Sequence, residues 1–320
     1  MIRLYEILKI VNDLQEQGEL ELAQRIAGQY MDRLDSGELR FNHLAITARL
    51  GQTNQVMDLL ENYLDTSHWF STWFLQRIPE LKQLESLPRY QRIIQSIDEK
   101  EAQYWQDKSI KPIIQVPHVA QPPYPLLIAI HGNGFNAIHS SDHWSCAVES
   151  GWLVFHPLAK RLAGRGSHWW VSHEENHAII EQQAQEYIFQ YPIDYSRVIL
   201  SGFSKGGEVA MVLTLRGWLG AKGFITVGAG GYFHLKPELW LPLLESPPRG
   251  LRGVAMYSPY DLERADGENQ TLKMLQAAEI QCEQWKYSGE GHVFPEDFPV
   301  YFQKAVDFVL RSNHSYPKAG

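Results

Sequence analysis

The chain falls into two parts that differ in the spacing of their apolar residues. In residues 1 to about 107, apolar positions recur every three to four residues, as in Leu4, Ile7, Leu8, Val11 and Leu14. This period is typical of amphipathic helices. From about residue 108, short uninterrupted apolar runs alternate with amphipathic stretches, as buried strands alternate with helices. The pattern predicts a helical domain over residues 1–107 and an α/β domain over residues 108–320.

Two glycines mark turns within the helical part. Gly18 and Gly51 lie 33 residues apart, and each is followed five residues later by a small apolar residue, Ala23 or Val56. This spacing resembles the helix–turn–helix unit of tetratricopeptide-like repeats, in which two helices pack closely after a tight turn. An irregular helical bundle is the alternative. We expect a domain of this kind to do no chemistry. It should instead cover a face of the second domain or mediate association with a protein partner or a second copy of the chain.

An aromatic cluster follows these units, made of Trp69, Phe70, Trp73 and Phe74. We expect it to be core between the helical domain and its neighbour rather than a ligand site.

A proline-rich linker between Lys111 and Pro125 leads into the second part. The expected strands are residues 126–130, 152–155, 198–200, 223–227, 254–257 and 282–287. The expected helices are residues 174–190, 208–219, 269–278 and 300–310. Such alternation predicts a parallel sheet covered by helices on both faces. Because ligands of these sheets bind at the carboxyl ends of the strands, the loops after the strands are where chemistry is expected.

One of these loops has the pattern of a nucleophile elbow. The strand that ends near Leu200 runs into Gly202-Phe203-Ser204-Lys205-Gly206, and a helical pattern follows. A turn this tight leaves no room for a Cβ at either glycine, and it presents the serine hydroxyl at its tip. Ser204 is therefore the candidate nucleophile. A plain glycine- and serine-rich loop is the alternative.

The first strand ends in His131-Gly132-Asn133-Gly134. In acyl-transfer enzymes a loop of this type supplies half of an oxyanion hole, and the residue after the nucleophile supplies the rest. We therefore expect the backbone N–H groups of Asn133 and Lys205 to be the donors. The Lys205 side chain is expected to point along the helix to solvent and not to act as a base.

An acid and a histidine follow the nucleophile in the order that this fold requires. Asp261 directly follows the strand at 254–257, with Glu263 and Asp266 as alternatives. His292 is in a glycine-flanked loop after the last strand, from which its imidazole could reach the serine while the carboxylate holds its other nitrogen. The candidate catalytic residues are thus Ser204, Asp261 and His292.

Trp169 and Trp170 form a further aromatic group, which could line a substrate pocket or pack under the helical domain. The nearby His168, His173 and His177 raise the question of a metal. Because no cysteine or carboxylate lies at ligand spacing in that segment, we expect no metal.

Composition narrows the class of protein. The net charge of −8 argues against nucleic acid or an anionic membrane as partner. No apolar run approaches membrane-spanning length, and the first residues lack the apolar stretch of a secretion signal. The two cysteines, Cys146 and Cys282, are expected to be buried and reduced. We expect a cytoplasmic protein.

These motifs together resemble the α/β-hydrolase superfamily over residues 112–310. The stretch Gly202–Gly207 is similar to the Gly-Phe-Ser-Gln-Gly-Gly of the phospholipase/carboxylesterase and dienelactone-hydrolase-like branch, with Lys205 in place of glutamine. His131-Gly132 and the loop around His292 also match. The acid departs from the pattern, since Ser-Pro-Tyr-Asp261 replaces Gly-x-x-Asp.

The resemblance implies a serine esterase that needs no cofactor and acts on a small-molecule ester. A thioesterase or peptidase with the same triad is an alternative. A non-catalytic scaffold that binds a partner through the helical domain is another.

Overall fold

The computed structural model describes residues 3–66, 68–259, 261–289 and 291–311. The chain forms two compact units. The helical unit contains Met1–Ile110 together with Leu162–Arg165, and the sheet unit contains Lys111–Arg161 and Gly166–Gly320. The helical unit is therefore not one continuous stretch of sequence.

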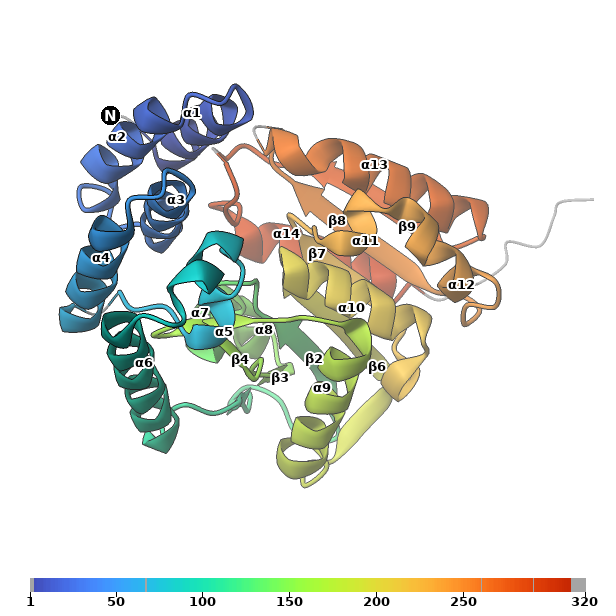
Figure 1. Cartoon of the computed structure of the whole chain (residues 1–320). Coiled ribbons are helices and arrows are strands. Elements are labelled where there is room, and N and C mark those ends of the chain that lie inside the picture. The colour runs from blue at the N-terminus through green and yellow to red at the C-terminus, as the bar shows by residue number, and fades with distance from the viewer. Residues whose placement is uncertain (1–2, 67, 260, 290, 312–320) are drawn as a thin grey trace, which may run out of the picture. The chain divides into compact units, whose positions relative to one another are not determined.

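The helical unit is built from helices that pack against their neighbours along the chain (Figure 1). They are α1 (Leu4–Glu16), α2 (Leu20–Met31), α3 (Gly37–Arg49), α4 (Thr53–Asp65), α5 (Thr72–Leu75), the 3-10 turn Pro79–Leu84 and α6 (Pro88–Gln106). Gly18 follows α1 and Gly51 follows α3, with φ of +79° and +69°. Both glycines thus permit left-handed turns, and the small residues after them, Ala23 and Val56, are buried.

The aromatic cluster packs inside this unit. The rings of Phe70 and Phe74 lie 5.5 and 4.5 Å from the ring of Phe41. The segment just after Phe70 is paired with the detached piece of the unit, since Ser71 N–H donates to the Ala163 carbonyl at 2.8 Å. Phe70 and Phe74 therefore contribute to the core of the helical unit itself.

The sheet unit is organised around seven strands in the order β1-β3-β2-β6-β7-β8-β9. They are β1 (Ile113–Gln115), β2 (Tyr124–Ile130), β3 (Leu153–His156), β6 (Ile193–Phe203), β7 (Gly223–Val227), β8 (Arg252–Tyr257) and β9 (Gln281–Lys286). All pairs are parallel except β1 with β3. The antiparallel strand β1 was not expected, because it lies in the proline-rich stretch read as a linker.

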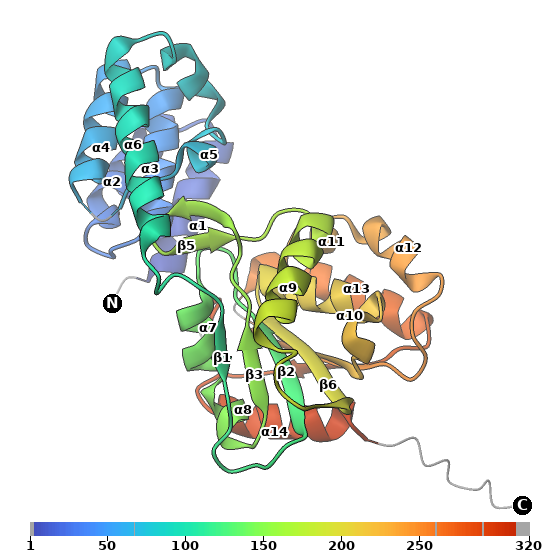
Figure 2. The ribbon, with the colours of Figure 1, turned by 90° about the horizontal axis from the view of Figure 1, so that it is seen from below.

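Helices cover both faces of this sheet (Figure 2). They are α7 (Ala137–His143), α8 (Ser145–Glu149), α9 (His173–Tyr187), α10 (Lys205–Leu215), α11 (Tyr232–Leu235), α12 (Leu241–Leu244), α13 (Leu262–Ala277) and α14 (Phe298–Val309). The remaining elements are the hairpin strands β4 (Arg161–Gly164) and β5 (Ser167–Trp169) and the 3-10 turns Trp218–Gly220 and Pro237–Trp240. None of the described helices combines the length and the apolar character needed to cross a bilayer.

The two faces of the sheet have separate apolar cores. Leu127 and Ala129 of β2 pack with α8 and α14, whereas Leu126, Ile128 and Ile130 pack with α9 and α10. Because successive side chains of a strand point to opposite faces, a strand buried on both sides must be apolar throughout, as β2 is. The predicted fold class, a mostly parallel sheet covered by helices and preceded by a helical region, is confirmed. The parallel strands end at one edge, where the candidate residues lie.

Candidate active site

Ser204 is the single residue between the end of β6 and the start of α10. Its backbone has φ of 54° and ψ of −126°, a conformation that residues other than glycine rarely adopt. The flanking glycines explain how the turn forms. A Cβ on Gly202 would lie 2.4 Å from the carbonyl of Gly206, and one on Gly206 would lie 2.2 Å from the Ile130 carbonyl oxygen. The predicted need for glycine at both positions is confirmed. The turn is thus pressed against the end of β2.

The loop after β2 touches the serine. A Cβ on Gly132 would lie 3.1 Å from the Ser204 Cβ. The Asn133 side chain accepts a hydrogen bond from the backbone N–H of Trp170 at 2.8 Å, and this bond holds the loop in place. The backbone N–H groups of Asn133 and Lys205 have no hydrogen-bond acceptor among the described residues. Two unused donors therefore lie in the segments that meet at Ser204.

His131 stiffens this loop as a neutral side chain. Burial lowers its pKa to about 3. Its Nε2 accepts from Ala159 N–H at 3.2 Å, so its Nδ1 carries the proton and donates to the Gly132 carbonyl at 2.8 Å. The ring also lies 4.9 Å from that of Trp170, whose indole N–H donates to the His131 carbonyl at 2.7 Å. His131 is thus part of the loop's support.

His292 and Asp261 come together although 31 residues separate them. His292 Nδ1 lies 2.6 Å from Asp261 Oδ2. The imidazole stacks on Phe203, the residue before Ser204, with 4.4 Å between ring centroids. It also lies against Gly228 after β7, where a Cβ would be 2.9 Å from the ring. The imidazole is therefore held next to the elbow by a ring, a glycine and a carboxylate.

Asp261 occupies the N-cap position of α13, directly after β8. The side chains of the alternatives Glu263 and Asp266 lie outside the described part of the structure. The turn that carries Asp261 is tied to the loop of His292, because the Ser258 hydroxyl donates to the Gly289 carbonyl. This tie brings the ends of β8 and β9 together at the site.

The expectation that the Lys205 side chain points to solvent is wrong. It is buried, and its ammonium pairs with the carboxylate of Glu208, one helical turn further along. From the sequence, Glu208 was predicted only as the first residue of a helix. The signal was available, since a lysine and a glutamate three residues apart lie on the same side of a helix.

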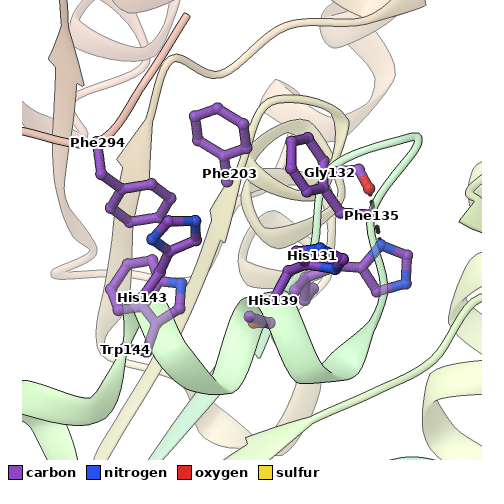
Figure 3. Close-up of a pocket in the computed structure, with 10 residues that line it drawn as sticks. His131, Gly132, Phe135, His139, His143, Trp144, Phe203 and Phe294 are labelled. Atoms are coloured by element: carbon purple, nitrogen blue, oxygen red, sulfur yellow. Dashed lines mark hydrogen bonds between the residues drawn. The ribbon is translucent and has the colours of Figure 1, made fainter. Parts of the chain in front are cut away.

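Trp169 and Trp170 do not line the small cavity beside the elbow. Trp170 is buried behind the loop after β2, as its two hydrogen bonds show. The cavity is lined mostly by aromatic and histidine rings and has room for about one water molecule. Figure 3 shows Phe294 over His143 at one end of it, and these two rings stack at 4.2 Å.

The three histidines considered for a metal have separate partners. His168 Nδ1 lies 2.7 Å from the Ala159 carbonyl, His173 Nε2 lies 3.1 Å from Glu208, and His177 Nε2 lies 3.8 Å from Glu181.

Comparison with known proteins places the fold. No protein-family model matches the chain, and no curated protein matches its sequence. An uncharacterized protein from Bacillus cereus aligns over 96% of this chain and 99% of its own, with a TM-score of 0.53 and 16% identity.

Two further solved structures each align with a smaller share of the chain. An S-formylglutathione hydrolase from Agrobacterium tumefaciens covers 62% of this chain and 89% of its own, with a TM-score of 0.49 and 15% identity. A ferulic acid esterase covers 62% of this chain and 91% of its own, with a TM-score of 0.48 and 15% identity. At these identities the likeness is one of fold. The sheet unit has the α/β-hydrolase fold, preceded by a helical region.

Proposed function

We propose that the protein is a serine hydrolase that cleaves a carboxylic ester through an acyl-enzyme. One observation carries this proposal. Ser204 has a left-handed backbone conformation, the residue before it, Phe203, stacks on the His292 imidazole, and Nδ1 of that imidazole lies 2.6 Å from the Asp261 carboxylate. These are the three groups that nucleophilic acyl transfer needs, and they lie at the edge of the sheet where such folds bind ligands.

Each group has a role that follows from its position. Ser204 Oγ attacks the ester carbonyl while His292 Nε2 takes the hydroxyl proton. Asp261 fixes the imidazole with its proton on Nδ1 and stabilises the charged ring. When the alcohol leaves, His292 returns the proton to it. Water then attacks the acyl-enzyme, with His292 again as the base.

The developing negative charge on the carbonyl oxygen needs donors of its own. The backbone N–H groups of Asn133 and Lys205 are proposed for this, because both lie next to Ser204 in the fold and neither is used elsewhere among the described residues. Removing one such donor typically costs about 3–4 kcal/mol of transition-state stabilisation.

The same groups would serve a thioesterase or a peptidase, and these remain the alternatives. A non-catalytic scaffold is less well supported, because it would have no use for the backbone conformation of Ser204. We propose that the helical unit does no chemistry, since the candidate residues all belong to the sheet unit. Its left-handed glycine turns support a tetratricopeptide-like character, and for a unit of that kind we propose a role in binding a protein or a second copy of the chain.

The test is a fluorophosphonate probe together with a series of aryl esters of increasing acyl length. Ser204→Ala should abolish labelling and lower kcat by about 10⁴-fold or more. Ser196→Ala is the matched control, because Ser196 is an exposed serine on the same strand, and its hydroxyl donates to Asp194. Undiminished labelling of Ser204→Ala would reject the proposal.

A further inference from the structure

Glu208 is a fully buried carboxylate next to the proposed active site. It lies four residues after Ser204 on α10, and its exposed fraction is 0%. Removing an ionised carboxylate from water is costly unless other groups replace its hydration. The surroundings of Glu208 do so, and they include residues of α9, α10 and α11.

The groups that donate to Glu208 converge from three elements. Among the described residues they are Lys205 Nζ, His173 Nε2 at 3.1 Å, His234 Nδ1 at 3.0 Å, and the backbone N–H groups of Phe233 at 2.9 Å and His234 at 3.2 Å. His173 begins α9, Lys205 begins α10, and Phe233 and His234 are in α11. One side chain thus ties together the starts of three helices at the carboxyl edge of the sheet.

The electrostatics keep the carboxylate ionised. Burial raises the pKa of Glu208, but hydrogen bonds from His173 and His234 and the charge of Lys205 outweigh burial and hold that pKa far below its ordinary value. Burial lowers the pKa of His173, and its Nδ1 has no hydrogen-bond partner among the described residues. His173 is therefore a neutral donor, and the Lys205 ammonium is the countercharge of Glu208.

The loop that Glu208 holds reaches the other proposed catalytic residues. Gly228 borders the His292 ring, and Gly230 N–H donates to the Ser204 carbonyl at 3.2 Å. Gly231 lies against the carboxylate itself, because a Cβ there would be 2.6 Å from Glu208 Oε2. A displacement of Glu208 would therefore move the backbone that touches Ser204 and His292.

We propose that Glu208 is a positioning residue of the active site. It anchors the Lys205 side chain, and with it the backbone N–H next to Ser204, and it holds the Gly228–His234 loop against Ser204 and His292. The role rests on the acyl-enzyme function proposed above. This role differs from support of the fold alone. Glu208 positions groups that stabilise the transition state, so its loss should lower kcat more than it raises KM.

Glu208→Gln tests this role on the full chain. With p-nitrophenyl acetate, kcat should fall about 100-fold, as on loss of an oxyanion donor, while KM changes less than about threefold. A new ionisation should also enter the pH profile of kcat, because Lys205 would keep a buried charge without its carboxylate. The other groups facing this charge are His173 and His234, and Arg216 reaches the His173 carbonyl at 3.4 Å. Glu61→Gln, which breaks an ion pair with Arg89 in the helical unit, is the control and should leave kcat unchanged.

Gly231→Ala provides a second test if Glu208→Gln does not fold. It retains every charge of the cluster but pushes a methyl group into the carboxylate, so kcat should fall at least about tenfold with KM nearly unchanged. A folded Glu208→Gln, or failing that Gly231→Ala, with the parental kcat and pH profile would overturn the proposal. If Ser204→Ala had meanwhile lost labelling, the acyl-enzyme would stand and only the role of Glu208 would be rejected.

Discussion

The two units place their charged and polar groups differently. In the helical unit, ion pairs such as Lys9–Asp13 and Arg89–Glu61 lie at the surface, where each contributes little to stability. The sheet unit buries Glu208 and several histidines. The helical unit also buries Arg40 and His43, but in the sheet unit Glu208 and most of the buried histidines gather near the ends of the strands. Burial of polar groups is costly, so this gathering marks that edge of the sheet as the place where geometry is fixed for chemistry.

Glycine shows the same contrast. Gly18 and Gly51 adopt a positive φ and have open space around the position of a Cβ. Gly202 and Gly206 have no room for a Cβ, because backbone atoms already lie there. The helical unit uses glycine for the direction of the chain, whereas the elbow uses it for close contact between segments.

The largest expected effect that separates the units is acid sensitivity. Burial lowers the pKa of His131 and His156 to about 3 and that of His168 to about 4. Below the ordinary histidine pKa of about 6.5, the unfolded chain binds protons that the folded chain does not, so stability is fully present above that pH and is lost as pH falls. Each histidine should remove about 1.4 kcal/mol per pH unit below about 6.5.

Hydrogen exchange between pH 7.5 and 5, corrected for intrinsic exchange rates, measures the protection of backbone amides in each unit separately. Amides of β2, β3 and β6 should lose protection earlier than those of α4 and α6, whose sequences contain no histidine. His156→Gln should flatten the pH dependence of unfolding in urea by about 1.4 kcal/mol per pH unit. Equal loss of protection in both units would contradict the comparison.

Alanine at the two kinds of glycine should give the next largest effect. Gly206→Ala should cost roughly 3 kcal/mol or more, because its methyl group would overlap the backbone at the end of β2. Gly18→Ala should cost only about 1 kcal/mol, the cost of a positive φ without steric overlap. Urea unfolding of both variants measures the difference. Similar costs would show that the elbow can relax.

The smallest effect concerns two serines that begin helices of the helical unit. Ser36 and Ser71 both accept a backbone N–H at an N-cap, and Ser71 also donates to the Leu162 carbonyl. Ser36→Ala should cost about 1 kcal/mol, as is typical of a lost cap. Ser71→Ala should cost about 1 kcal/mol more, from the second hydrogen bond. Thermal unfolding monitored by circular dichroism compares the two, and identical costs would mean that the bond to Leu162 contributes nothing.

The sequence predicted those features of the structure that depend on residues close together in the chain. The apolar runs predicted the parallel strands, and Gly-x-Ser-x-Gly between a strand and a helix predicted the elbow. The roles of Ser204, Asp261 and His292 stay predictions, although the last two are in contact.

What the sequence did not show depends on contacts between distant segments. Strand β1 exists because β3 offers it an edge, despite the prolines around it. The burial of Glu208 depends on His173 and His234, which belong to two other helices, α9 and α11. Neither partner can be recognised from spacing along the chain.

The detached piece of the helical unit has a consequence for synthesis. Leu162–Arg165 belong to that unit, and the carbonyls of Leu162 and Ala163 accept hydrogen bonds from Ser71. Because translation runs from the N-terminus, residues 1–110 leave the ribosome before Leu162–Arg165 and cannot yet form these bonds. The segment that completes them emerges only after β2 and β3 of the other unit. The helical unit therefore cannot form its last hydrogen bonds until β2 and β3 of the central sheet have been synthesised.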